Sequence, residues 1–204
     1  MHKEWFQDVR TEFIGVNIPF ADYALGFGIN TTNIGDIQLR TRPGPSEGTF
    51  SSHDFALGAS FAMNVAPSLN AGITLKFLYE KIFVDEASGV AADIGVLYQT
   101  PIEGLKLALA GSNFGSMGNL RNDKIKLPSL LRVGSSFVRE LDIVHSTLTV
   151  GADLVKVFRE DKAHLHTGAE LSYQEKIAFR AGYLFGYESR GLTVGLGLRR
   201  DFLR

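Results

Sequence analysis

The feature of this sequence that most limits its fold is a period of two in its apolar residues. From Asp54 the chain reads DFALGASFAMNV, so Phe55, Leu57 and Phe61 share one face while small or polar residues share the other. Strict alternation of this kind is typical of a β-strand whose two faces meet different environments. We find about eleven such segments and no convincing helical period. The segments cover residues 9–20, 23–34, 51–65, 69–82, 90–99, 104–113, 126–139, 145–157, 163–173, 177–187 and 191–203.

The connections between these segments favour a membrane barrel over a soluble sandwich. One set is short and falls at residues 21–22, 66–68, 101–103, 140–144 and 174–176. The other set is mostly longer and more polar, and falls at residues 35–52, 81–89, 112–124, 158–162 and 188–190. The two sets interleave, as the short periplasmic turns and longer extracellular loops of outer-membrane barrels do. The sequence therefore predicts an all-β, antiparallel up-and-down transmembrane β-barrel.

The lengths of the segments and their aromatic residues agree with this prediction. Most segments reach the about 9–11 residues that a tilted barrel strand needs to cross a bilayer. Aromatic residues lie beside the short turns, where an interfacial girdle is expected, at Phe20, Tyr23, Tyr98, Phe137 and Tyr173. The alternative is a soluble barrel or sandwich, in which the apolar face would be packed in a dry core. The membrane interpretation predicts exposure of ten apolar side chains: Leu57, Phe61, Ile73, Leu75, Ile94, Val96, Val150, Phe179, Val194 and Leu196.

Composition excludes several other classes of protein. The chain has 204 residues, with 21 Lys and Arg against 22 Asp and Glu, so its formal charge is -1. A general nucleic-acid binder needs an excess of basic residues, which is absent here. The chain contains no cysteine, which excludes disulfides, thiolate-bound zinc and cysteine nucleophiles. His145 and Ser146 are adjacent on a strand and face opposite ways, so they form no catalytic dyad, and we expect neither enzyme activity nor a cofactor.

Charged residues share the face of the glycines, which would line the barrel interior. They have mixed sign, which suggests a network of ion pairs more than an ion-selective pore. Such side chains could also bind a plug segment or the carboxylate of a substrate. The predicted lumen-facing charges are Lys76, Asp93, Lys106, Arg132, Asp153, Glu170, Arg180 and Arg199.

The short turn at residues 174–176 fixes a specific register. If Tyr173 pairs with Ile177, then Glu170 lies directly opposite Arg180, close enough for an ion pair. The same count of alternate positions places Asp153 beside His166, and Lys76 near Asp93.

A histidine pair is the one candidate for metal binding. His164 and His166 are two residues apart and therefore point the same way on a strand. A metal would need a third ligand, for which Asp153 is a candidate and His145 is too far away. The alternative is a polar lining with a cross-strand hydrogen bond, and we expect no metal.

One stretch near the start of the chain resembles a known family. His2 to Gly15 reads HKEWFQDVRTEFIG. It resembles the H-x-E-W-F-x-D-[IV]-R-x-E-[FY]-[LI]-G stretch of the PorV/PorQ family of outer-membrane proteins, which are similar in fold to FadL-type fatty-acid channels. The specific match covers about residues 2–20; the family often also has an N-x-G turn where this chain has Asn113-Phe114-Gly115. The resemblance implies a barrel of about fourteen strands.

The resemblance and the odd number of segments together predict that residues 1–204 are a single barrel domain truncated at both ends. The strands containing Ile14 and Leu196 would then be the sheet edges. The resemblance implies a place in the bacterial outer membrane and a role in protein export of the type IX kind, with secretion-machinery proteins or exported cargo as partners. The alternatives are a channel for hydrophobic small molecules such as fatty acids, and a structural barrel. Trp5 and Phe6 are candidates for contact with cargo on the extracellular side.

Overall fold

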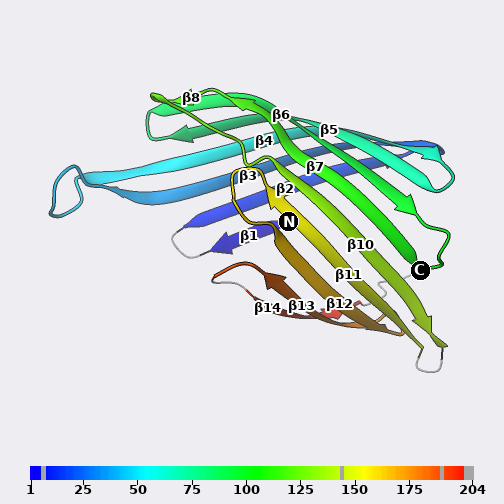
Figure 1. The fold of residues 1–204 in the computed structure, drawn as a ribbon. Helices are drawn as coiled ribbons and strands as arrows, with labels where there is room; N and C mark the ends of the chain where they lie inside the picture. The colour runs from blue at the N-terminus through cyan, green and yellow to red at the C-terminus, as the bar shows by residue number, and fades with distance from the viewer. Residues whose placement is uncertain (6–7, 143–144, 189–190, 200–204) are drawn as a thin grey trace. The chain divides into compact units, whose positions relative to one another are not determined.

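The computed structural model describes residues 1–5, 8–142, 145–188 and 191–199, and the elements in these ranges are all β-strands (Figure 1). No helix in these ranges is long and apolar enough to cross a membrane. The longer strands are β2 (Val9–Pro19), β3 (Tyr23–Leu39), β4 (Gly48–Ala66), β5 (Leu69–Ile82), β6 (Asp85–Gln99), β7 (Leu105–Met117), β10 (Leu130–Leu141), β11 (Ser146–Val157), β12 (His164–Tyr173), β13 (Ile177–Phe185) and β14 (Leu192–Leu198). The short strands are β1 (His2–Trp5), β8 (Asn119–Leu120) and β9 (Asp123–Lys124).

Twelve strands form a large antiparallel up-and-down sheet in the order β1-β2-β3-β4-β5-β6-β7-β10-β11-β12-β13-β14, and β8 and β9 form a separate hairpin. The chain divides into two compact units. Unit 1 comprises residues 1–64, 72–94 and 113–127, and unit 2 comprises residues 65–71, 95–112 and 128–204. The all-β, up-and-down prediction is therefore confirmed.

Each predicted segment corresponds to a strand, but the predicted first edge is wrong. Ile14 lies in β2, and β2 pairs with β1 through Trp5↔Val9 as well as with β3. The predicted edge at Leu196 agrees with the strand order, because β14 is its last member. Strand β1 was missed because a short polar stretch carries no alternation of apolar and polar residues.

The predicted long connections are partly wrong. The connection predicted at residues 81–89 is a two-residue turn, Phe83–Val84, between β5 and β6. Likewise β3 and β4 run well into the predicted loop at residues 35–52 and leave only residues 40–47 between them. The added strand residues include Ile37, Leu39 and Phe50, but the register of β3 and β4 shifts between Ile34 and Ile37, so the alternation of the longer segment does not continue in step. The sorting of connections by length therefore holds only in part.

Asn113 is not in a turn, as the family's N-x-G pattern suggested, but inside β7. Its φ is 60°, a left-handed conformation that marks a β-bulge when it occurs within a strand. The next glycine permits a very close approach of strands: a Cβ on Gly115 would lie 2.0 Å from the carbonyl oxygen of Val90. The bulge and this glycine together set how β7 lies against β6 in unit 1.

The hairpin β12–β13 in unit 2 has the predicted register. Tyr173 pairs with Ile177, Glu170 with Arg180, and Gly168 with Gly182. The turn between them places Gln174 and Glu175 at φ values of 49° and 57°, and the Lys176 N–H donates to the Tyr173 carbonyl at 3.0 Å. Two consecutive left-handed residues are the mark of a type I′ turn, whose twist suits a tight hairpin.

The apolar face of the strands is exposed, as predicted. Of the ten side chains that were expected to be exposed, nine are so, from 41% at Phe61 to 79% at Val194, and Val96 is half-buried. In the described ranges the buried apolar residues are Ala87, Ala91, Met117 and Val155. The described strands therefore enclose no large apolar core. We call the exposed apolar residues at alternate strand positions the apolar band, and the opposite side the polar face.

Candidate functional site on the polar face

In unit 1, Lys76 stands at the centre of a cluster that joins three neighbouring strands. Its ammonium lies 2.7 Å from Asp93 Oδ1 on β6 and donates to Asn113 Oδ1 on β7 at 2.5 Å. The Asn113 backbone N–H also donates to Asp93 Oδ1, at 2.8 Å. The side chains of Lys76 and Asp93 are only 18% and 29% exposed. The predicted proximity of Lys76 and Asp93 is confirmed, and the bulge adds Asn113, which no alternation pattern could have placed on this face.

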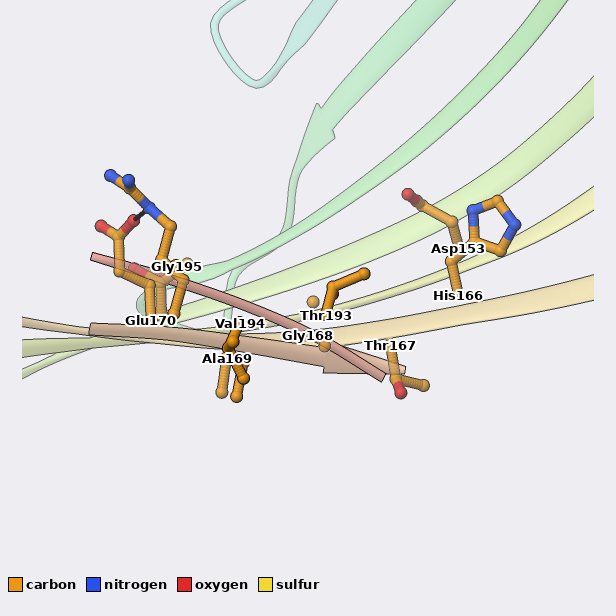
Figure 2. A pocket seen from close by; sticks show the side chains of 14 residues that line it. Asp153, His166, Thr167, Gly168, Ala169, Glu170, Thr193, Val194 and Gly195 are labelled. Carbon is orange, nitrogen blue, oxygen red and sulfur yellow. Dashed lines mark hydrogen bonds and ion pairs between the residues drawn. The ribbon is translucent and has the colours of Figure 1, made fainter. Parts of the chain in front are cut away.

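In unit 2, Glu170 and Arg180 form the predicted ion pair through Oε2 and Nε. Figure 2 shows Glu170, Thr193, Asp153 and His166 on one side of the strands, and Thr167 and Ala169 on the other. The guanidinium of Arg180 reaches over the strand β14, because a Cβ on Gly197 would lie 3.0 Å from Nη1. Glycine at that position is therefore what gives the arginine room.

Asp153 and His166 pair directly across β11 and β12, as predicted. The carboxylate of Asp153 folds over the neighbouring strand, where a Cβ on Gly134 would meet Oδ1 at 2.1 Å. His166 Nε2 is hydrogen-bonded to the Tyr187 hydroxyl at 2.9 Å. Sequence reasoning did not identify Tyr187, because alternation in the predicted segment 177–187 puts it on the face of Tyr183 and Phe185, whereas β13 ends at Phe185 and Gly186 has a φ of 87°.

His164 and His166 both contact Tyr187, but their Nε2 atoms bond to different groups. The His164 ring is stacked on Tyr187 with ring centroids 4.0 Å apart, and its Nε2 lies 2.7 Å from Glu160 Oε2. His164 is buried, with 7% of its surface exposed, and Nδ1 has no hydrogen-bond partner in the described ranges. Those ranges contain no cluster of three or more His, Cys, Asp or Glu side chains that could hold a metal.

The remaining predicted residues do not join one network. Lys106 and Arg132 are exposed, and neither forms an ion pair with a described residue. Arg199 lies 3.9 Å from Glu175, a pair in which both side chains are largely exposed and which contributes little stability. Trp5 lies in β1, and Phe6 lies outside the described residues. Among the described residues, the predicted charges that pair do so in separate local pairs, Lys76–Asp93, Glu170–Arg180 and Glu175–Arg199.

Each unit has a depression on its polar face. In unit 2 it measures about 530 Å³ and lies over glycines at positions 151, 168, 182 and 195, beside Glu170 and Arg180 (Figure 2). In unit 1 it measures about 640 Å³ and is bordered by Phe13, Leu78, Lys76 and glycines at positions 15, 26, 28 and 58. The Phe13 ring lies against Gly15 and Gly28, where a Cβ would come within 3.0 Å and 3.4 Å of it. Both volumes are in the range of small-molecule sites.

Two carboxylates of unit 1 lie on the polar face beyond the end of the apolar band, at the level of polar His53 on the other face. Asp54 and Glu80 border a common depression of about 180 Å³. Burial raises the pKa of Asp54, and the charge of His53 opposes that shift. Burial also raises the pKa of Glu80, and the negative charge of Asp54 adds to that effect. Asp54 and Glu80 are the two carboxyl groups in the described ranges whose pKa values are raised, and they border the same depression.

The chain matches no protein-family model, and it matches no curated protein.

Proposed function

We propose that this chain forms the wall of an outer-membrane β-barrel of the PorV/PorQ type, which supports protein export across the outer membrane. The observation that carries the proposal is the exposed apolar band, opposite a face of glycines and charged side chains. Monomeric soluble proteins rarely expose contiguous apolar surface on this scale. Hydrocarbon is the environment that suits such a face, and a closed barrel of antiparallel strands is one of the two structures that can cross it.

Export as the role rests on the resemblance of residues 2–20 to that family. Its partners would be outer-membrane lipid, secretion-machinery proteins and exported cargo. The far ends of β3 and β4 carry the polar connection at residues 40–47, which offers a surface on which such proteins would dock.

A second candidate is a channel for hydrophobic small molecules. The depression in unit 1 favours it, because Phe13 and Leu78 supply apolar contacts and Lys76 supplies a positive charge. Against it, that charge is already paired with Asp93 at 2.7 Å. A carboxylate ligand would therefore have to compete with Asp93.

Deletion of the encoding sequence in its host separates these functions. Export predicts that secreted proteins accumulate in the periplasm while uptake of long-chain fatty acids is unchanged. A channel predicts the reverse. If deletion impairs neither export nor fatty-acid uptake, both functions are contradicted and the structural barrel remains. A chain lacking Trp5 and Phe6 tests the cargo-contact role, which predicts reduced export with an unchanged amount of protein in the membrane.

A further inference from the structure

The apolar band of unit 1 contains a depression of about 600 Å³. Its walls are large apolar side chains on four neighbouring strands, namely Leu57, Leu75, Phe77, Val90 and Phe114. All five are exposed, from 42% at Phe114 to 62% at Val90. The depression therefore lies on the outside of the band, on the face opposite Lys76 and Asp93.

The sequence explains why the band is hollow here. Ala59 on β4 and Ala92 on β6 border the depression on either side of Leu75 on β5. Small side chains between large ones leave a gap that neighbouring strands cannot fill. The bulge at Asn113 adds the far wall: because Asn113 directs its side chain to Lys76, the next residue, Phe114, falls on the apolar face.

The depression offers an occupant almost no polar contact. Lys76 borders it, but its ammonium is held on the other face by Asp93 and Asn113, at 2.7 Å and 2.5 Å. Only the aliphatic part of that side chain is available to the depression. Ser116 supplies the one side-chain hydroxyl among the lining residues.

We propose that this depression is a binding site for one acyl chain of a membrane lipid, held more tightly than the lipids around it. The proposal rests on the proposed function, in that the apolar band faces hydrocarbon. A flexible chain can follow an outline in which small and large side chains alternate. A helix of a partner protein, about 10 Å across, would need a wider and straighter groove. A volume of about 600 Å³ is within the range of ligand sites.

The first test fills the depression and counts retained lipid. The chain in detergent micelles containing phosphatidylcholine is examined by native mass spectrometry. The proposal predicts one retained phospholipid, and at least tenfold less of that adduct in Ala92→Leu. The matched control is Ala181→Leu, on β13 of unit 2 beside exposed Val194, a position that does not border this depression. The control should retain lipid like the unchanged chain.

The second test does not depend on a filled cavity. Trp5 is the only tryptophan, so the variant Trp5→Phe has no tryptophan fluorescence of its own. In this background Phe114→Trp reports on the depression and Phe179→Trp reports on an ordinary exposed position of the apolar band. In detergent micelles with increasing amounts of brominated phosphatidylcholine, quenching at position 114 should reach half its maximum at a mole fraction of that lipid at least fivefold lower than at position 179, because the site prefers phospholipid to detergent.

The outcomes separate this proposal from the proposed function. Quenching at neither tryptophan would mean that the apolar band does not meet lipid, and both proposals would fail. Equal quenching curves at the two positions, or equal lipid loss in Ala92→Leu and Ala181→Leu, would leave the membrane assignment intact and overturn the acyl-chain site.

Discussion

Replacing a glycine where strands lie close together has a cost that depends on which group the new Cβ would meet. A Cβ on Gly115 would meet the Val90 carbonyl oxygen at 2.0 Å, and that oxygen belongs to the backbone. A Cβ on Gly134 would meet the Asp153 carboxylate at 2.1 Å, but that group can rotate away. We expect Gly115→Ala to lower the free energy of unfolding by about 2–3 kcal/mol, and Gly134→Ala by less than about 1 kcal/mol. Urea unfolding in micelles measures both, and equal losses would contradict this assignment.

Asp54 and Glu80 predict an unusual dependence of stability on pH. A carboxyl group whose pKa is raised by folding binds its proton more tightly in the folded state. Stability should therefore rise as pH falls through the raised pKa values, and level off below the ordinary values of 3.8 and 4.5. Glu80→Gln should stabilise the chain at pH 7 and flatten this rise. Glu170→Gln is the control, and should destabilise at pH 7 because Arg180 loses its partner. Stabilisation by both variants would show that the opposed carboxylates are not the cause.

At the scale of elements, the turn of the β12–β13 hairpin is strained by its own sequence. Glu175 has a φ of 57°, a conformation that costs an ordinary residue about 1–2 kcal/mol and that glycine adopts freely. Its ion pair with Arg199 is long and exposed, so little is lost with the side chain. Glu175→Gly should raise the free energy of unfolding by about 1 kcal/mol. Glu175→Ala, which lacks both the carboxylate and the freedom of glycine, should give no gain in the same unfolding experiment.

The two ion pairs should differ in strength. The Lys76 and Asp93 side chains are 18% and 29% exposed and share Asn113, whereas those of Arg180 and Glu170 are 54% and 35% exposed. Surface pairs are usually worth about 0–1 kcal/mol, and sheltered pairs can be worth more. Double-mutant cycles with Lys76→Met and Asp93→Asn, and with Arg180→Met and Glu170→Gln, should give the larger coupling for the first pair. The reverse order would show that shelter does not set the coupling here.

The sequence predicts a strand well only where the two faces of that strand differ in polarity. The alternation of apolar and polar residues located the eleven longer strands. Counting residues outward from the tight turn at 174–176 gave the pairing of Glu170 with Arg180. Alternation failed in β1, which is short and mostly polar, and in the far ends of β3 and β4, where the register shifts between Ile34 and Ile37. It also failed at Asn113, because a bulge reverses parity without changing composition. A charge network was predicted and separate pairs were found, for a related reason. Whether a residue number is odd or even gives the face on which its side chain lies, but not the neighbour that the side chain contacts.

At the scale of the whole molecule, the exposed apolar band is the observation on which the account depends. A dry core would hide these side chains from every solvent, and a surface in water would expose both faces alike. Strand β5 offers a direct comparison, since exposed Ile73, Leu75 and Phe77 alternate with Thr74 and Lys76.

Spin labels along β5 test this most directly, and the absence of cysteine allows single labelling sites without other changes. In lipid bilayers, collision rates with oxygen, which concentrates in hydrocarbon, and with a water-soluble nickel complex are measured at each position from 70 to 77. The account predicts a period of two, with oxygen collisions highest at 73, 75 and 77 and lowest at 72, 74 and 76. Uniformly low collision rates with both reagents at 73, 75 and 77, or access of the nickel complex to every position, would contradict a lipid-facing apolar band.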